Sequence, residues 1–183
     1  MTTQETATAS STTPATGSTN PAVSATLPME AIREHWQGHR RVTRRVIEAF
    51  PEEAFESYSI GGMRPFSELA LEMIGMAEPG IYGLVTGNWS GPDNLEHHTQ
   101  TPARPDKAHI LRRWDDITAL IDRLWPQIAP GRLETTETAF GLYHQPLYNT
   151  LLYFIDNEIH HRGQGYVYLR SLGIEPPAFW DRS

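Results

Sequence analysis

PLYNTLLYFIDNEIHHRGQGYVYLRSL, residues 146–172, is the last long apolar stretch of the chain. Proline suits the first turn of a helix, because the N–H that it lacks would be unpaired there. Gly173 and the pair Pro176-Pro177 follow the stretch and act as stop signals. The pattern predicts one long, central helix. Residues at spacings of three and four form its buried stripe: Leu151, Phe154, Glu158, His161, Gly165, Tyr168 and Leu172.

A block of polar residues interrupts the middle of this apolar helix, and it comprises Asp156, Asn157, Glu158, His160, His161 and Arg162. Burying charged or imidazole groups is unfavourable unless they are paired or bind a metal. The block is therefore exposed, satisfied by partners inside the protein, or functional.

The composition excludes several classes of partner and site. The 183 residues carry a formal net charge of -7, and Arg40, Arg41, Arg44 and Arg45 form only one short basic patch. Phosphate binding usually needs a broad basic face, so nucleic acid is not an expected partner. The chain has no cysteine, so a metal would have to be held by histidine, carboxylate or amide groups.

Residues 1–26 are rich in Thr, Ser and Ala, and we expect them to form a disordered tail. They lack the basic start and the continuous apolar core of a secretory signal. No later stretch is long and uncharged enough to cross a bilayer. We expect one domain over residues 27–183, a cytoplasmic location and no membrane partner.

The first predicted helix covers residues 28–50, with Thr26 as its N-cap. Its apolar residues again recur at spacings of four and three, which predicts a stripe of residues facing the interior of the bundle. His39 falls on this stripe. The Arg40-Arg41 and Arg44-Arg45 pairs fall mainly on the opposite face, where we expect solvated charges.

Two more helices precede the central one. The second covers residues 66–88, and we expect Pro79 and Gly80 to kink or interrupt it. The third covers residues 106–125, with Asp106 as its N-cap. Both have the apolar spacing of helices packed in a bundle.

The predicted connections between the helices are long. Residues 55–64 form a connector, and residues 89–105 form a loop that contains His97 and His98. Residues 129–145 form a short extended segment or an irregular lid. In the aromatic tail, residues 175–183, we expect Phe179 and Trp180 to fold back onto the bundle or to reach another subunit. The predicted fold is all-α, with four principal helices packed as a bundle.

The spacing within the polar block permits a metal site. Asn157 and Glu158 stand four and three residues before His161, so either can share a helix face with it. Glu72, at the edge of the second helix's buried stripe, can supply a further oxygen. These donors suit Zn, Ni, Fe or Mn. From the spacing alone, a buried network of ion pairs and hydrogen bonds is the alternative.

Two segments resemble a known family. NEIHHRGQGYVYLRSLG, residues 157–173, is similar to the signature of the DinB-like (YfiT-like) metalloenzyme superfamily. In that signature the last helix carries a histidine, three intervening residues and then HRGQ. SIGGMRPFSELALEMIGMAEPGI, residues 59–81, is similar to the second helix of the family and its approach. The resemblance extends over residues 31–180.

The resemblance implies an antiparallel four-helix bundle, a homodimer, and a divalent metal held by three histidines. His161 matches the last of these three positions, while Asn157 stands four residues before it and Glu72 stands on the second helix. Both replacements can donate oxygen, and Glu158 is the alternative to Asn157. The metal would be Fe, Mn, Ni or Zn, and the oxygen donors shift the preference toward Fe or Mn. Three residues are expected around the ligands as orienting groups or proton carriers: His39, His160 and Arg162.

Two alternative functions follow. The resemblance implies a metal-dependent hydrolase or a thiol-dependent transferase that acts on a small molecule. The departure from three histidines favours a non-catalytic bundle that has lost the metal and acts through dimerisation or a stress-response partner. The chain contains neither a nucleotide-phosphate loop nor a cofactor fingerprint that would name the substrate.

Overall fold

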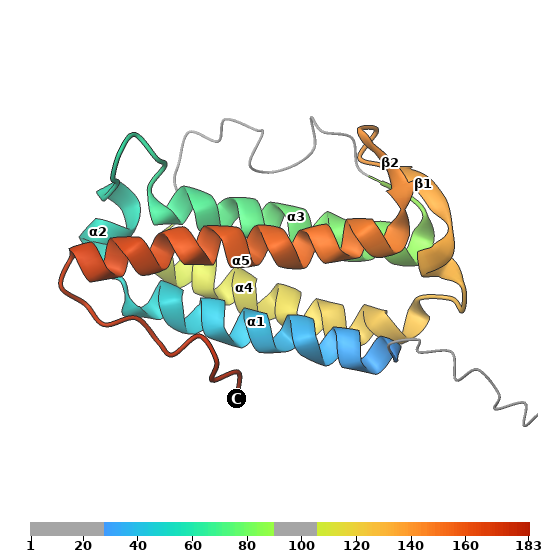
Figure 1. The fold of residues 1–183 in the computed structure, drawn as a ribbon, viewed down its shortest axis with the longest axis horizontal. Coiled ribbons are helices and arrows are strands. Elements are labelled where there is room, and N and C mark those ends of the chain that lie inside the picture. Colours follow the sequence, from blue (N-terminus) through green and yellow to red (C-terminus); the bar gives the residue numbers. More distant parts are fainter. Residues whose placement is uncertain (1–27, 90–105) are drawn as a thin grey trace, which may run out of the picture.

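Four long helices lie side by side in the computed structural model, which describes residues 28–89 and 106–183 (Figure 1). They are α1 (Met29–Ala49), α3 (Phe66–Thr86), α4 (Lys107–Leu124) and α5 (Leu147–Ser171). The shorter elements of the described residues are α2 (Glu52–Ser57), η3 (Trp125–Gln127), η4 (Arg132–Glu134), β1 (Thr136–Ala139) and β2 (Tyr143–Pro146). The predicted all-α class is confirmed, with the addition of one short hairpin.

The helices begin where the sequence places prolines and an aspartate. Pro28, Pro65 and Pro146 each directly precede a long helix. Proline is tolerated there because the first N–H groups of a helix have no partner within it. Asp106 caps α4 as predicted, and its carboxylate accepts the backbone N–H of His109 at 2.6 Å. The predicted N-cap Thr26 lies outside the described residues.

In the first half of the chain the structure differs from the predicted elements in two places, and of the two outcomes expected at Pro79 and Gly80, a kink or an interruption, the interruption does not occur. Residues 52–57 form α2, which overlaps the predicted connector, because Phe55 is buried and stacks edge-on against Phe50 and Phe66. In addition, α3 continues through Pro79 without interruption. At Gly80, the residue after Pro79, α3 packs closely against α5. A Cβ at this position would clash with the ring of Phe154.

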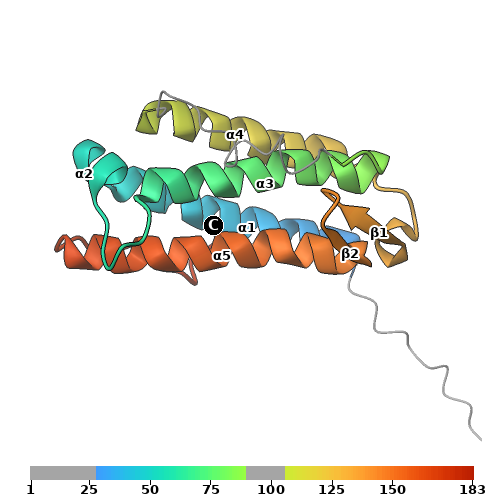
Figure 2. The ribbon, with the colours of Figure 1, turned by 90° about the horizontal axis from the view of Figure 1, so that it is seen from above.

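Contacts between α3 and α5 show that these two helices run in opposite directions (Figure 2). Near the end of α3, Gly80 lies against Phe154 at the start of α5. Near the beginning of α3, Phe66 lies against Gly165 at the end of α5. The middle of α3 therefore faces the polar block of α5.

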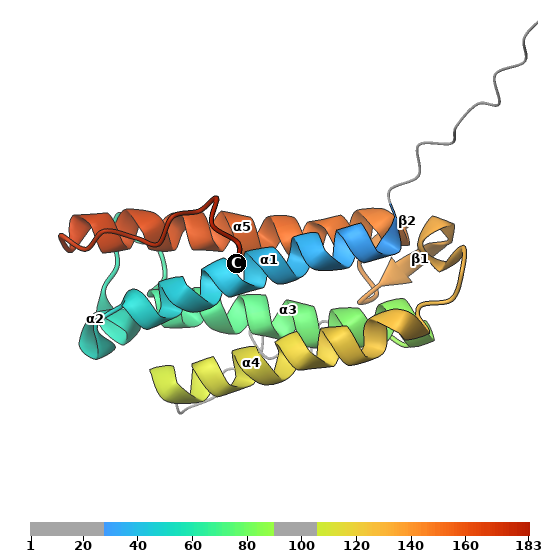
Figure 3. The ribbon, with the colours of Figure 1, turned by 90° about the horizontal axis from the view of Figure 1, so that it is seen from below.

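In contrast, α1 and α5 run in the same direction (Figure 3). The ring of Trp36 stacks on that of Phe154, with 6.3 Å between centroids, and Thr43 is hydrogen bonded to Glu158 further along both helices. The expected antiparallel arrangement thus describes α3 against α5 but not α1 against α5. The polar block of α5 is consequently flanked by the middle of α1 as well.

The predicted extended segment is a hairpin of β1 and β2, paired antiparallel with Ala139 opposite Tyr143. Its turn contains two positive φ angles, 55° at Phe140 and 71° at Gly141. Phe140 adopts this uncommon conformation while its side chain is fully buried, so core packing holds the turn in place. The hairpin sets Tyr143 close to α5, where its ring centroid lies 5.8 Å from that of Tyr153.

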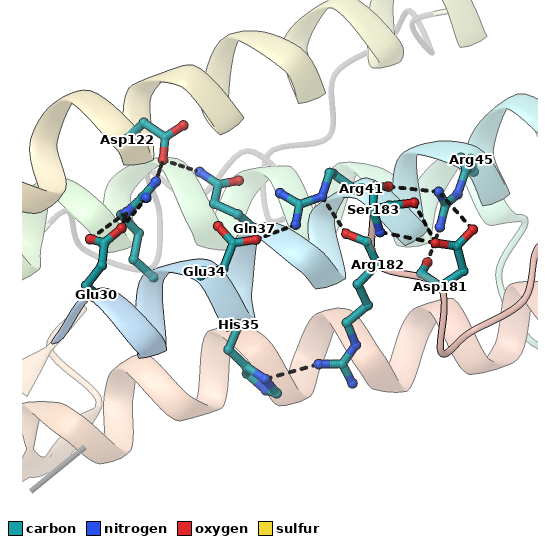
Figure 4. A network of polar contacts seen from close by, with 11 residues as sticks. Glu30, Glu34, His35, Gln37, Arg41, Arg45, Asp122, Asp181, Arg182 and Ser183 are labelled. Atoms are coloured by element: carbon teal, nitrogen blue, oxygen red, sulfur yellow. Dashed lines mark hydrogen bonds and ion pairs between the residues drawn. The ribbon is translucent and has the colours of Figure 1, made fainter. Parts of the chain in front are cut away.

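The C-terminal segment, residues 172–183, folds back along α1 and α5 (Figures 3 and 4). Arg41 donates to the backbone oxygen of Arg182 at 2.6 Å, and Arg182 is hydrogen bonded to His35 at 3.1 Å. The side chains of Phe179 and Trp180 nevertheless remain 60% and 73% exposed. The backbone folds back, but the two aromatic rings, which were expected to pack onto the bundle or another subunit, face outward.

No helix in residues 28–89 and 106–183 combines the length and the hydropathy that a membrane span requires.

Two glycines of α5 test the close packing of this helix. A Cβ added at Gly165 would lie 2.8 Å from Cζ of Phe66, which is fully buried, whereas a Cβ at Gly163 would meet no atom within 4 Å. We expect Gly165→Ala to lower the free energy of unfolding by about 1–3 kcal/mol through overpacking. Gly163→Ala is the matched control and should raise it by up to about 1 kcal/mol through helix propensity. Urea unfolding followed by circular dichroism measures both, and equal stability of the two variants would contradict the packing.

Candidate functional site

The polar block of α5 is divided between two sides of the helix. Asn157 and His161, four residues apart, face α3, and both are buried. Glu158 and Arg162, also four residues apart, face α1 and are buried there. His160 is exposed. Each buried pair makes contacts with a different neighbouring helix, so the block forms two separate groups.

The group that faces α3 is here called the Glu72 cluster, and it consists of Arg64, Glu72, Asn157, His161 and Gln164. His161 Nε2 lies 3.0 Å from Glu72 Oε1, and Asn157 Nδ2 donates to the same oxygen at 3.2 Å. The other oxygen of Glu72, Oε2, accepts a hydrogen bond from Arg64. The side chains of Glu72 and His161 are 17% and 7% exposed. Two expected metal ligands, Asn157 and His161, therefore meet at one oxygen atom of the third, Glu72.

His161 is held between two oxygen acceptors. Its Nδ1 lies 2.8 Å from Gln164 Oε1, while its Nε2 faces Glu72. The amide of Gln164 is oriented by Met63, whose sulfur accepts the Gln164 N–H at 3.6 Å. A neutral imidazole can donate from only one of its nitrogens. With the Gln164 amide in this orientation, both contacts are favourable when the ring carries a second cation, either a proton or a metal.

Glu72 carries a negative charge in this environment. The hydrogen bond with His161 holds the pKa of Glu72 well below its ordinary value, and the bond from Arg64 lowers it further against the effect of burial. Because Arg64 binds Oε2, the oxygen directed at His161 and Asn157 is Oε1. The Glu72 carboxylate therefore points one oxygen, Oε1, toward the centre of the cluster.

The side chains of the Glu72 cluster fit a divalent cation in their chemistry. Asn157 Oδ1 is buried and makes no hydrogen bond, and the buried His161 Nε2 is directed at Glu72 Oε1, 3.0 Å away. An amide oxygen, a carboxylate oxygen and an imidazole nitrogen are all metal donors. Within the described ranges, three His, Asp or Glu side chains do not gather at any one point. A metal here would therefore depend on the amide of Asn157 as its third donor.

The second group, which faces α1, is here called the Arg40 network, and it consists of His39, Arg40, Thr43, Glu158 and Arg162. Thr43 Oγ1 donates to Glu158 Oε1 at 2.8 Å, and Arg40 lies 3.8 Å from Glu158 Oε2. Burial raises the pKa of Glu158, and the charge of Arg40 opposes this. Glu158 was expected as the alternative ligand to Asn157, but the structure places it on the α1 side.

The remaining members of the Arg40 network are Arg162 and His39. Arg162 donates to the His39 backbone oxygen at 3.1 Å, and its second terminal nitrogen lies 2.9 Å from His39 Nδ1. Burial lowers the pKa of His39 to about 3, and the charges of Arg162 and Arg182 contribute to this shift. His39 and Arg162 were expected around the metal ligands, but they lie together on the other side of α5. Of the expected surrounding groups, only His160 adjoins the Glu72 cluster, with its ring 5.0 Å from that of His161.

Arg40 was expected among solvated charges, and this expectation was wrong. Its side chain is fully buried, with the guanidinium 4.0 Å from the centre of the Trp114 ring. It also donates to Thr118 Oγ1 at 2.8 Å and to the Trp114 backbone oxygen at 2.9 Å. These partners come from α4, so the pattern of α1 alone contains no signal for this burial.

Sequence reasoning also missed Arg64 and Tyr153 beside Glu72. Tyr153 stands four residues before Asn157, so helical spacing places the two on one face. Arg64 precedes α3 and had no such signal. The expected loop histidines, His97 and His98, lie outside the described residues.

A family model described as the DinB family matches residues 23–182 of the chain. The chain belongs to the DinB family. No curated protein sequence matches it.

Solved structures of DinB-like proteins have the same fold. One is a DinB-like protein from Bacillus cereus, with a TM-score of 0.64, 18% identity, and coverage of 81% of this chain and 95% of the other. A DinB-like protein from Bacillus subtilis gives a TM-score of 0.62 at 18% identity, covering 81% and 96%. A protein from Exiguobacterium sibiricum that is assigned to the DinB family gives 0.60 at 24% identity, covering 79% and 91%.

The buried His39 of this DinB protein should make its stability depend on pH. In the unfolded chain His39 binds a proton near pH 6.5, whereas in the folded protein its pKa is about 3. Between these values the unfolded state binds more protons, so the free energy of unfolding falls as the pH falls, by at most about 1.4 kcal/mol per pH unit. His39→Gln keeps an acceptor for Arg162 and should lessen this slope. Urea unfolding between pH 7.5 and 4.5 compares the two proteins, and identical slopes would contradict the assignment.

Proposed function

We propose that this DinB protein binds a divalent metal in the Glu72 cluster, through Glu72, Asn157 and His161. The observation that carries the proposal is the position of His161, whose two ring nitrogens both face oxygen acceptors. A metal at Nε2 leaves the proton on Nδ1, where Gln164 accepts it. The buried Oδ1 of Asn157, which makes no hydrogen bond, also supports a metal at this site.

The proposed reaction is hydrolysis or thiol-dependent transfer on a small molecule. A divalent ion with open coordination positions supplies Lewis acidity or lowers the pKa of a bound water. Gln164 fixes the tautomer and the ring orientation of His161, and Arg64 holds Oε2 of Glu72 so that Oε1, the oxygen directed at Asn157 and His161, is the one that would bind the metal. Two oxygen donors against one imidazole favour Fe or Mn over Zn or Ni.

A non-catalytic role is the second candidate, and one observation favours it. Arg64 pairs with Glu72 directly, so the carboxylate already has a cationic partner from the chain itself. A protonated His161 between Glu72 and Gln164 would then complete a structural network. The two candidates differ in whether the cluster takes up metal.

Metal content decides between the two candidates. We expect the untagged protein to hold stoichiometric metal after incubation with Mn, Fe, Ni or Zn, as measured by inductively coupled plasma mass spectrometry. His161→Ala and Glu72→Ala should lose it because each removes a donor. His160→Ala is the matched control, since it removes the neighbouring exposed histidine and should retain the metal. Absence of metal from the wild type, or its retention in His161→Ala, would favour the structural network.

We further infer a DinB-type four-helix bundle that forms a homodimer through the outer face of α5. Three exposed apolar residues follow one stripe of this helix, with exposed fractions of 46%, 47% and 37%: Tyr148, Leu152 and Ile159. An apolar stripe on an outer helix face is typical of protein interfaces.

Sedimentation velocity tests the homodimer. We expect the wild type to sediment with the mass of two chains and Leu152→Arg to sediment as a single chain, because a charge would be buried unpaired at the interface. Leu142→Arg, at an exposed leucine of the hairpin, is the control and should leave the mass unchanged. A wild type with the mass of one chain would exclude this dimer.

A further inference from the structure

Two kinds of side chain flank the Glu72 carboxylate. Arg64, in the segment before α3, donates to Oε2, and its side chain is 46% exposed. Its backbone oxygen accepts the hydroxyl of Tyr168 at 2.9 Å, which ties the segment to α5. The guanidinium is thus held beside the cluster while part of it faces solvent. An arginine in this position can give further hydrogen bonds to an incoming anion.

The other flank consists of two tyrosines, Tyr153 from α5 and Tyr143 from β2. Their ring centroids are 5.8 Å apart with 32° between the ring planes, and each residue is 42% exposed. Burial raises the pKa of Tyr153, and the nearby Tyr143 and the negative charge of Glu72 raise it further. Tyr153 stands one helical turn before Asn157 in α5, so helical spacing places the tyrosine pair next to the Glu72 cluster.

The balance of charge at the cluster changes when a metal binds. Without a metal, the single negative charge of Glu72 is offset by Arg64. A divalent ion held by Glu72, Asn157 and His161 would leave a net positive charge, since Glu72 is the one carboxylate in contact with these residues in the described part of the chain. Such a site favours an anionic ligand.

We propose that the metal-loaded Glu72 cluster binds a small carboxylate that carries an aromatic ring, with the carboxylate at Arg64 and the metal and the ring against Tyr143 and Tyr153. This proposal rests on the proposed function, because the metal supplies the uncompensated charge. Charge-assisted hydrogen bonds from a guanidinium give orientation to a carboxylate. Tyrosine rings offer a flat apolar surface with favourable edge or offset contacts for another ring.

Calorimetric titration of the metal-loaded protein tests the proposal with three probes: phenylacetate, acetate and 2-phenylethanol. Phenylacetate carries both features of the proposed ligand, acetate has only the carboxylate, and 2-phenylethanol has only the ring. We expect phenylacetate to bind at least about tenfold more tightly than either of the others, since a charge-assisted hydrogen bond or an aromatic contact contributes roughly this factor.

Two variants separate the contributions of the flanks. Arg64→Gln should weaken phenylacetate binding about tenfold and leave 2-phenylethanol binding unchanged. Tyr153→Leu should reduce the preference for phenylacetate over acetate. Arg170→Gln and Tyr82→Leu are controls, because they change the same residue types at exposed positions away from the cluster, near the ends of α5 and α3 respectively. Neither control should change the affinity for phenylacetate.

Measuring metal in each sample distinguishes the two ways in which the proposal can fail. A loaded protein that binds phenylacetate no better than acetate, or equally well after Arg64→Gln and Tyr153→Leu, would overturn the ligand assignment and leave the metal site intact. A wild type that takes up no metal would overturn the metal site and the ligand assignment together.

Discussion

The burial of polar side chains in the middle of α5 is the constraint on which the rest of the structure depends. This helix is covered by α1 on one side and by α3 on the other, so the polar residues on these two sides are largely shielded from bulk water. A buried charge without partners is strongly unfavourable. The neighbouring helices must therefore place complementary polar groups opposite these residues. Thr43 of α1 and Glu72 of α3 are such groups.

The two sides of α5 satisfy this constraint differently. On the α1 side, Glu158 is fully enclosed by Thr43 and Arg40, and Arg40 is further fixed by Trp114 of α4. This arrangement ties three helices together and leaves little room for a ligand. On the α3 side, Glu72 and His161 keep a small exposed fraction, and Arg64 and Tyr153 beside them are partly open to solvent. The Glu72 cluster is therefore more open to solvent than the Arg40 network.

Part of the fold and of the candidate site was predictable from short-range patterns. The Asp106 cap and the long helix that ends at Ser171 follow from local signals, and the spacing of Asn157 and His161 places them on one face. The burial of Arg40 was not predictable, because its partners Trp114 and Glu158 come from residues distant in sequence. The position of Arg64 beside Glu72 depends likewise on how the segment before α3 folds.

The sequence by itself determined that the chain is mostly helical and that two pairs of polar residues lie about 100° apart around α5. The tertiary structure alone decided that Asn157 and His161 meet Glu72, whereas Glu158 and Arg162 meet α1. The physical reason is that the period of a helix fixes the angles between its own side chains. It does not specify which neighbour faces each side, because the packing of all four long helices sets that relation.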